Sequence, residues 1–598
     1  MGAATPDFYL RGDLNNWGSP ADRQFTRTGD TYSLHVDALD GKFKIANSDW
    51  SVNFGAATDG AVSVSGPCYR DGVQDGANFE AAALCDVDIS FVYTGSSTAE
   101  IKFVVGGVEP SRDGLTSGTL PVLYINVYGA DGGYDNEIIS KDLDHKNYFA
   151  GEYWLDLNGC EWLAAEGGES VGSAEAPLPL EIKARGNYTR RAFAKKPFKL
   201  KLGAKKSLLG MTKSKHYAIL AHADDDKGYM RNFTGFSLGR RIGLPWTPWQ
   251  QPVEVVINGD YRGLYFLTES IRVGDGRVPV EELDDLEGNP DLVSGGYVVE
   301  LDNYDEDNQI RLEEKGQAPV DKDVLRVTFD TPEEYSPLQL RFITDQFTAI
   351  NDLIGDNSDD VWRYLDIDDA ARYYLVEEII SHTEAYHGST YLFRDRGEGR
   401  KWHFSPLWDC GNAFNGPTDG FFYDHSPFGS TWIPSLRLND RFNSVVARTW
   451  LWFMSTGYKG FDDELAAYRD HLRAAAAADH RRWDGRPTPA DGQPVADNSD
   501  IDTRYRTVRD HLAAKIAWLK DRFGDYTAGT YAEPERDATP AAPLPEYLTA
   551  GVGEVSADAA AGTPVRYYNL QGQPVSSPAP GTLYITVDAD GRPSKTIL

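Results

Sequence analysis

The chain has 598 residues with 91 acidic and 59 basic side chains, which gives a formal net charge of −32. A field of this sign repels nucleic acid and anionic lipid, so neither is expected as a partner. No apolar run reaches the roughly 18 residues of a membrane-spanning helix, so no transmembrane segment is expected. Single hydrophobic cores stop growing at roughly 250 to 300 residues, so several domains are expected.

Residues 1–115 are predicted to form a β-sandwich. Short segments in which apolar and polar residues alternate are separated by Gly, Asn and Asp, as in strands joined by turns. Two tryptophans stand in this region, and each would either lie in the core or stack on a sugar ring. Sugar contact is favoured for Trp17, which follows an Asn-Asn pair, and core packing for Trp50.

Four cysteines occur, and none has the spacing of a zinc knuckle, so a structural zinc site is not expected. Cys68 and Cys85 share the first β-rich region, where either a disulfide or buried thiols would explain them. Cys160 and Cys410 lie further along the chain.

Residues 119–530 change from strand-like to helical patterning. Strand patterns continue to about residue 300, and apolar positions three and four apart then predict helices at 370–380 and 504–523. This order predicts an α+β domain with a β-rich lobe and a helical lobe, and a closed barrel would contradict it. Residues 531–545 are rich in Ala, Pro and Glu and predict a linker, and 546–598 predict a small β-module.

The segment 185–206 is strongly basic and contains no acidic residue, although the chain is acidic overall. Such an island favours an anionic ligand. Strand alternation places Lys199 and Lys201 on one face, and Arg185 opens a tight turn of the kind that binds phosphate. A solvated strand face that pairs with nearby carboxylates explains the charges equally well.

Three carboxylates are candidates for chemistry. Glu269 ends the second strand of an Asn-Gly hairpin, Glu384 follows the predicted helix, and Asp409 lies in a Trp-Asp turn. The short connections place Glu384 and Asp409 in one cleft. His382 and His387 are five residues apart, which does not fit metal ligation from one helical face, so both are expected to be core histidines.

The two ends of the chain resemble known modules. "YLRGDLNNWG" at 9–18, with "FKIA" at 43–46 and the Asp-Trp pair before residue 51, resembles starch-binding-type modules. That resemblance implies glycan binding through Trp17 and Trp50. "YNLQG" at 568–572 and "GTLYI" at 581–585 resemble the C-terminal modules of type IX secretion. It implies a secreted or outer-surface protein whose signal peptide has been removed.

Five blocks of the central region, taken in order, resemble the CotH kinase family. They are the Arg-Gly-Asn turn at 185–187, the Asp-rich turn with Arg-Asn at 224–232, the hairpin at 256–269, "GGYVVE" at 295–300 and "SPLWD" at 405–409. The resemblance implies a secreted, atypical protein-kinase-like fold. It also implies transfer of the γ-phosphoryl group of ATP to protein hydroxyls with Mg²⁺ or Mn²⁺.

The resemblance also implies roles for single residues. Phosphates would be held by a lysine and two arginines, with one acid on that lysine and one on the metal. The residues are Lys196 or Lys199 with Arg185 and Arg231 for the phosphates, Glu269 for the lysine and Asp409 for the metal.

The sequence departs from the family pattern at two places that matter for transfer. Glu384 and Ser389 stand where active members usually carry Asp and Asn, and Gly411 stands where they carry a second Asp. Ser is a poorer metal ligand than Asn. Two alternatives to a kinase therefore remain: a non-catalytic surface protein that binds a glycan or host ligand, and a metal-dependent glycosidase or peptidase that uses Glu384 and Asp409.

Overall fold

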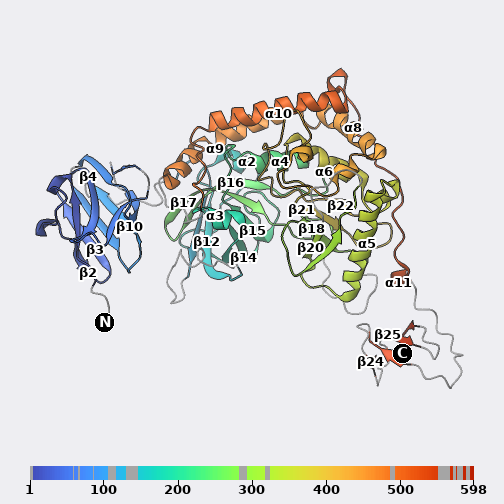
Figure 1. Ribbon diagram of the computed structural model, residues 1–598, viewed down its shortest axis with the longest axis horizontal. Helices are drawn as coiled ribbons and strands as arrows, with labels where there is room; N and C mark the ends of the chain where they lie inside the picture. Colours follow the sequence, from blue (N-terminus) through green and yellow to red (C-terminus); the bar gives the residue numbers. More distant parts are fainter. Residues whose placement is uncertain are drawn as a thin grey trace. The chain divides into compact units, whose positions relative to one another are not determined.

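The computed structural model has a mixed α+β fold (Figure 1). The chain divides into two compact units. Unit 1 comprises Met1–Tyr229, Gln250–Glu269 and Ala466–Tyr505, and unit 2 comprises Met230–Trp249, Ser270–Leu465 and Arg506–Leu598. Within them, the residues described are 5–57, 60–64, 68–84, 86–105, 116–128, 146–281, 293–316, 324–484, 492–549, 566–569, 574–575, 583–587 and 593–597.

The N-terminal part of unit 1 is a ten-stranded sheet that packs against itself. The Phe8 ring lies 5.0 Å from Tyr32 and 5.3 Å from Phe91, although the strand of Phe8 pairs at the other end of the sheet. The two ends therefore enclose one apolar core, as in a sandwich. The strands are β1 (Phe8–Gly12), β2 (Thr26–Thr28), β3 (Thr31–Val36), β4 (Leu39–Asn47), β5 (Asn53–Ala56), β6 (Val62–Ser63), β7 (Cys68–Gln74), β8 (Phe79–Leu84), β9 (Val87–Val92) and β10 (Thr98–Val105), with 3₁₀ turns η1 (Asp13–Asn15) and η2 (Ala21–Arg23).

The second part of unit 1 is a closed seven-stranded barrel in the order β11-β12-β13-β14-β15-β17-β16. Parallel pairing of β11 with β16 closes it, and Val122 lies opposite Glu254. Closure leaves no unpaired strand edge, and the alternate inward side chains form one core. The strands are β11 (Val122–Val127), β12 (Phe149–Asp156), β13 (Leu178–Ala184), β14 (Phe198–Lys206), β15 (Ser214–Leu220), β16 (Gln250–Ile257) and β17 (Asp260–Glu269), with short helices α2 (Glu161–Ala165) and α3 (Tyr188–Ala192).

The closed barrel contradicts the prediction for 119–530, which excluded a barrel, whereas the mixed α+β character with strands before helices is as predicted. The sequence patterns predict the strands but not the pairing of two strands that are far apart in the chain. The physical reason is that a parallel pair needs no turn signal between its members.

Unit 2 combines a five-stranded sheet, in the order β19-β20-β18-β21-β22, with helices. Helices α9 and α10 each contribute residues to both units along the chain. Among the described residues, no helix is long and apolar enough to cross a bilayer. The elements are α4 (Arg231–Arg241), β18 (Tyr297–Asp302), β19 (Gln309–Glu313), β20 (Val324–Thr331), α5 (Pro337–Gly355), η5 (Asp359–Arg363), α6 (Ile367–Ile379), β21 (Thr390–Arg394), β22 (His403–Phe404), η6 (Phe422–His425), α7 (Ile433–Leu436), α8 (Asp440–Ser455), α9 (Phe461–Trp483), α10 (Ile501–Phe523) and η7 (Tyr526–Ala528).

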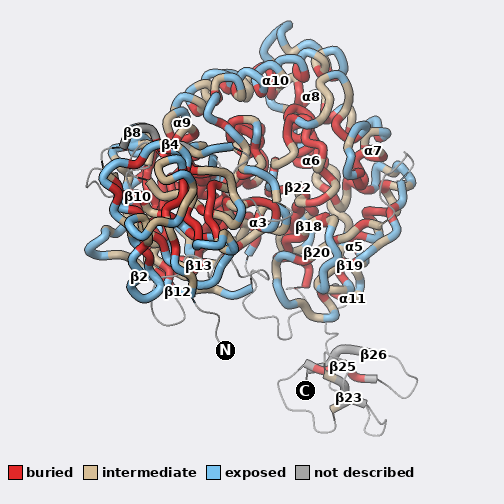
Figure 2. The backbone as a smooth tube through the Cα atoms, turned by 60° about the vertical axis from the view of Figure 1, so that its left-hand side comes forward, coloured by how far each residue is buried: buried red, intermediate tan, exposed pale blue. Residues whose placement is uncertain are grey.

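Helix α6 is buried over its whole length, as the tube in Figure 2 shows. It nevertheless carries five charged side chains, which are tolerated in the interior only when they have partners. Each charged residue of α6 has one in unit 2: Asp368 with the Asp537 backbone N–H, Asp369 with His403, Arg372 with Glu533, Glu377 with His382 and Glu378 with Lys515.

A segment that we call the strap, residues 530–549, lies extended along unit 2 and includes the expected linker. The Arg536 guanidinium lies 2.9 Å from Asp369, and Arg372 lies 2.6 Å from Glu533. The strap ends in α11 (Glu546–Thr549). It is therefore held to the unit by ion pairs along its length.

The C-terminal residues form a four-stranded sheet in the order β24-β23-β25-β26. Its strands are β23 (Arg566–Tyr568), β24 (Pro574–Val575), β25 (Leu583–Val587) and β26 (Pro593–Ile597). Cys85, one half of the proposed disulfide, lies outside the described residues, whereas Cys68, Cys160 and Cys410 are free thiols.

Candidate functional site

The turn that carries Glu384 and the loop that carries Asp409 are joined by backbone hydrogen bonds in unit 2. The Phe414 N–H donates to the Ile380 carbonyl at 2.7 Å, and the Gly416 N–H donates to the Ser381 carbonyl at 3.0 Å. These bonds connect the end of α6 to the loop that follows the Trp-Asp turn. The two candidate acids therefore lie on segments that cannot move independently.

His382 follows the end of α6 and is 2% exposed. Its Nδ1 lies 2.8 Å from a Glu377 oxygen, and its buried Nε2 makes no hydrogen bond. Burial opposes the charge of the imidazole, but the Glu377 carboxylate outweighs it, and Glu384 and Asp409 add to the effect, so the pKa of His382 is raised. The structure thus places Glu384 and Asp409 within electrostatic reach of one core histidine.

A chain of hydrogen bonds connects Glu384 to Arg231. The Asn412 amide donates to Glu384 Oε2 at 2.6 Å, and the Asn415 amide donates to Asn412 Oδ1 at 3.0 Å. Arg231, which is 6% exposed, donates through Nη2 to Asn415 Oδ1 at 3.1 Å and through Nε to the Ala413 carbonyl at 3.1 Å. Arg231 is therefore brought together with Glu384 through two amide side chains.

Asp409 is exposed and has a left-handed backbone with a φ of 53°. The next residue, Cys410, is buried, and its N–H donates to Asn232 Oδ1 at 2.9 Å, which anchors the turn on α4. Burial raises the pKa of the Cys410 thiol well above its usual range, so it stays protonated. At Gly411 a Cβ would lie 3.0 Å from Asp409 Oδ1, so the glycine leaves space beside the carboxylate.

The basic island of unit 1 is anchored by Lys195, a neighbour of the predicted Lys196. Its ammonium is fully buried and lies 2.9 Å and 3.0 Å from the two carboxylate oxygens of Asp479 on α9. Burial lowers the pKa of Lys195, although Asp479 opposes the shift. Asp479 also accepts from the Tyr229 hydroxyl at 2.7 Å and from the Leu264 N–H at 2.8 Å.

Gly263 makes this buried ion pair possible. Its φ is 97°, and a Cβ there would lie 2.1 Å from Asp479 Oδ1. The hairpin predicted at 256–269 therefore has two special glycines, because Gly259 with a φ of 72° forms the turn and Gly263 admits the carboxylate.

The other predicted residues of unit 1 have separate environments. Lys196 is half-buried and donates to the Arg190 carbonyl at 2.6 Å, and burial together with Arg190 and Arg262 lowers its pKa. Glu269 is fully buried and accepts from the Thr212 N–H at 2.9 Å. The predicted role of Glu269 as the partner of a lysine stays a prediction, and Lys195 pairs with Asp479. Arg185 is half-buried at the start of its turn.

Lys199 lies on the outer face of the barrel. It alternates with Phe198 and Leu200, which belong to the barrel core, and shares its face with Lys201. Lys201 pairs with Glu181 at 2.7 Å, as expected for a solvated strand face that pairs with carboxylates. Because Arg185, Lys196, Lys199 and Glu269 belong to unit 1, their approach to Asp409 stays a prediction.

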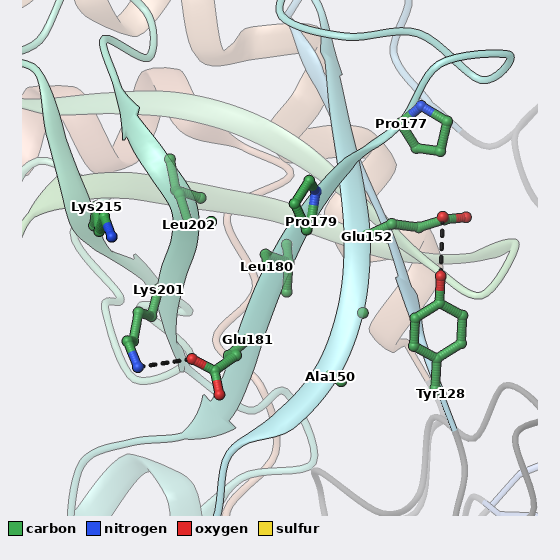
Figure 3. Close-up of a pocket in the computed structure, with 12 residues that line it drawn as sticks. Tyr128, Ala150, Glu152, Pro177, Pro179, Leu180, Glu181, Lys201, Leu202 and Lys215 are labelled. Carbon is green, nitrogen blue, oxygen red and sulfur yellow. Dashed lines mark hydrogen bonds and ion pairs between the residues drawn. The ribbon is translucent and has the colours of Figure 1, made fainter.

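A shallow hollow of about 610 Å³ opens on strands β12, β13 and β14 (Figure 3). The view shows the Lys201–Glu181 pair and a 3.0 Å hydrogen bond from the Tyr128 hydroxyl to Glu152 along its wall. None of its lining residues is a predicted site residue. We therefore do not assign the chemistry to this hollow.

A group of His and Asp side chains lies at the start of α6. Asp366, Asp369 and His403 bring ligand atoms within 4.8 Å of one another. However, Asp366 caps the helix by accepting from the Asp369 N–H at 2.9 Å, and His403 and Arg536 contact the Asp369 carboxylate at 2.7 Å and 2.9 Å. Asp366 thus caps the helix and Asp369 anchors the strap, so we do not assign a metal centre to this group.

Trp17 and Trp50 lie side by side on two turns of the N-terminal part, with ring centroids 6.2 Å apart and planes inclined by 32°. Both are half-buried and have left-handed backbones. Arg11 supports them, because its guanidinium lies 4.1 Å from the Trp50 ring and donates to the Trp17 carbonyl at 2.7 Å. The core packing expected for Trp50 is wrong, since this ring lies outside the apolar core.

Sequence reasoning missed the residues that link the predicted ones. Asp479 could have been singled out in the sequence, because it is an acid that directly follows five alanines. Lys195 had only its place in the basic island. Asn412 and Asn415 had no signal, because amide side chains have no periodicity that predicts a contact.

The chain matches the family model described as CotH kinase protein over residues 182–484, just over half of its length. It therefore belongs to the CotH kinase family. The comparison with curated proteins found no match. A solved structure described as "Ligand induced structure of AmyP-SBD" is 19% identical over 17% of this chain and 74% of that chain, with a TM-score of 0.15, which carries no argument about function.

Proposed function

We propose that this CotH-family chain transfers the γ-phosphoryl group of ATP to protein hydroxyls with Mg²⁺ or Mn²⁺. Membership of the family supports the reaction class. One observation carries the proposal. Glu384 and Asp409 lie on loops that are joined by backbone hydrogen bonds, and both carboxylates raise the pKa of His382. Phosphoryl transfer needs such a pair, one acid for the metal and one for the attacking hydroxyl.

Asp409 fits a divalent cation. Within the described residues its carboxylate makes no hydrogen bond or ion pair, and it is exposed. Mg²⁺ is usually held by one or two carboxylates, with phosphate oxygens and waters as its other ligands. When bound, the ion would neutralise charge on the phosphates. The space beside Gly411 leaves room for these ligands.

Glu384 is the candidate for the acceptor hydroxyl. Its carboxylate is held on one oxygen by Asn412, which fixes its direction. A carboxylate in this role orients the hydroxyl and accepts its proton as the phosphorus–oxygen bond forms. Glu384 is one methylene longer than the family's Asp, so the hydroxyl would bind correspondingly further from the turn.

For the phosphates we propose Lys196 and Arg185 of unit 1. Lys196 and Arg185 are half-buried, as is Lys199, but Lys199 shares the outer strand face of Lys201, and Lys195 is committed to Asp479. A cation on each β- or γ-phosphate would stabilise the charge that spreads over the transferred group.

Thermal unfolding with and without ATP and Mn²⁺ tests the proposal. A ligand at 100 times its Kd stabilises by about 2.7 kcal/mol, so a clear rise in Tm is expected with both components and none with either alone. Labelling of an acceptor protein with γ-phosphate would then measure transfer. If the protein neither binds ATP by calorimetry nor transfers phosphate, the kinase proposal is wrong, and the hydrolase alternative should be tested at the same acids.

A second proposal concerns glycan binding by the N-terminal sheet. The paired faces of Trp17 and Trp50, supported by Arg11, support it. Flat aromatic faces with polar surroundings suit sugar rings, and truncating such anchors typically costs about 2 kcal/mol or more. Trp17→Ala should abolish retardation on gels that contain soluble starch. Trp249→Ala is the control, because Trp249 is exposed and its ring, like that of Trp50, lies over an arginine, Arg240, at 3.9 Å.

Export to the outer surface is also a proposal, and it rests on the tail sequence. The tail includes two strands, β23 and β25, at the "YNLQG" and "GTLYI" segments. Fractionation of cells that produce the full chain with or without residues 546–598 would test it, since the proposal predicts loss of surface protein on truncation.

A further inference from the structure

We propose that Asn412 and Asn415 are positioning residues that hold Glu384 in its working orientation through a one-way chain of hydrogen bonds from Arg231. The inference rests on the proposed function, because it assigns a purpose to the orientation of Glu384. It concerns residues of unit 2 alone and does not depend on how the units are arranged.

The direction of the chain is fixed by its ends. A guanidinium can only donate hydrogen bonds, and an ionised carboxylate can only accept them. Asn415 must therefore turn its oxygen to Arg231 and its amide to Asn412, and Asn412 must turn its oxygen to Asn415 and its amide to Glu384. Neither amide can flip without placing two donors or two acceptors against each other.

A one-way chain strengthens its last bond. Each hydrogen bond polarises the next, and a bond to an ionised carboxylate is stronger than one between two neutral amides. The separation falls from 3.1 Å at Arg231 to 3.0 Å between the amides and 2.6 Å at Glu384. One oxygen of the Glu384 carboxylate thus receives the donor end of the chain.

The chain compensates for a departure from the family pattern. A Glu side chain has one more rotatable bond than Asp and loses more conformational freedom when it is held in place. A carboxylate on a longer side chain needs a second contact to hold it in one position. Displacement of a catalytic group by about 1 Å can lower the rate about 100-fold. Asn412, three residues beyond Asp409, supplies that attachment.

The test compares Asn412→Ala and Asn412→Asp with wild type and with Asn443→Ala. Asn443 is the matched control, because it accepts from a different arginine of unit 2, Arg437. We expect Asn412→Ala to lower kcat about tenfold or more, with the Kd of Mn²⁺–ATP changed by less than about twofold. Asn412→Asp should lower kcat further, because it places a second carboxylate against Glu384. Asn443→Ala should leave both quantities unchanged.

A second arm separates a positioning role from a general loss of structure. In a Glu384→Asp background the shorter acid cannot reach Asn412, so Asn412→Ala should then cost little. If Asn412→Ala lowers kcat by the same factor in both backgrounds, or affects nucleotide binding as much as kcat, the inference is overturned.

A third arm does not depend on catalysis. Thermal unfolding of wild type, Asn412→Ala, Glu384→Ala and the double variant, without nucleotide, forms a double-mutant cycle. Losses in Tm that are smaller together than their sum show that the two side chains are coupled, and additive losses overturn the inference. If wild type neither binds nor transfers, the proposed function fails, and this cycle still decides whether Glu384 is held by the chain.

Discussion

Each unit links a basic side chain to a carboxylate, but the two units differ in how far that carboxylate is buried. In unit 1, Lys195 and Asp479 are buried to 0% and 1% side-chain exposure, and the carboxylate is saturated by the ammonium, a hydroxyl and a backbone N–H. In unit 2, the chain from Arg231 ends at the half-buried Glu384, and the neighbouring Asp409 is exposed.

The difference separates charges that stabilise from charges that are available to a ligand. A buried, saturated ion pair has no capacity left for phosphate or metal, and its removal leaves an uncompensated charge. An exposed carboxylate that is held by its backbone contributes little to folding but can bind a cation. Four substitutions, ordered from the largest expected effect to the smallest, test this division.

Lys195→Met should destabilise the barrel most, by about 3–5 kcal/mol, because it leaves Asp479 buried without its counter-ion. Urea denaturation followed by tryptophan fluorescence measures the loss. A decrease in unfolding free energy below about 1 kcal/mol would show that water reaches the ion pair. The contrast between the two units would then be lost.

Asp409→Asn should weaken ligand binding and leave the stability of the ligand-free protein nearly unchanged. Asn tolerates the left-handed backbone at this position, so Tm without ligand should be nearly unchanged. The roughly 2.7 kcal/mol of stabilisation expected from saturating ATP and Mn²⁺ should disappear, because an amide is a poorer cation ligand than a carboxylate. Differential scanning fluorimetry with each component alone provides the controls, and an undiminished ligand shift would contradict the assignment.

Glu300 on β18 is an intermediate case. It accepts from the Ser389 N–H at 3.0 Å and the Tyr391 hydroxyl at 2.8 Å, and burial, aided by Asp302, raises its pKa from 4.5 to about 8. The folded state therefore keeps a proton that the unfolded state loses, so stability should fall as pH rises from about 4.5 to about 8 and level off above. The slope is at most about 1.4 kcal/mol per pH unit.

Glu300→Gln removes this titration while it keeps the acceptor oxygen. Its unfolding free energy, measured at several pH values, should decline less than that of wild type over the same interval. Parallel curves for the two proteins would show that Glu300 is charged in the folded state at neutral pH.

Lys201→Met should change stability least, by about 0–1 kcal/mol. Its partner Glu181 is 2.7 Å away, but both side chains are more than 40% exposed, and water and salt screen such pairs. The variant is also the control for Lys195→Met, since both remove one lysine of the same basic island. Equal losses of stability for the two variants would mean that burial does not decide how much each lysine of the basic segment contributes.

The sequence was informative wherever a local rule decides the structure. Alternation predicted β1 at Phe8–Gly12, the Asn-Gly pair predicted the turn between β16 and β17, and helical spacing predicted α6 and α10. It could also separate Lys199 from the barrel interior, because alternation places it on the same face as Lys201.

Contacts between distant segments were not predictable in the same way. Lys195 and Lys196 are adjacent and chemically identical, and the irregular turn before β14 decides which of them faces Asp479. The barrel closes through two strands with no local signal between them. The amides of Asn412 and Asn415 acquire their role only from the charges at either end.

The strap has a mechanical consequence. A pull applied at the C-terminal end would reach unit 2 through residues that lie along the unit and are attached at several separate points, such as Arg536 on Asp369 and Glu533 on Arg372. Attachments loaded lengthwise share a force, whereas attachments loaded end-on break one after another. A protein tethered by its tail would therefore carry tension into the strap and α6 together, with the load spread along the helix that supports His382.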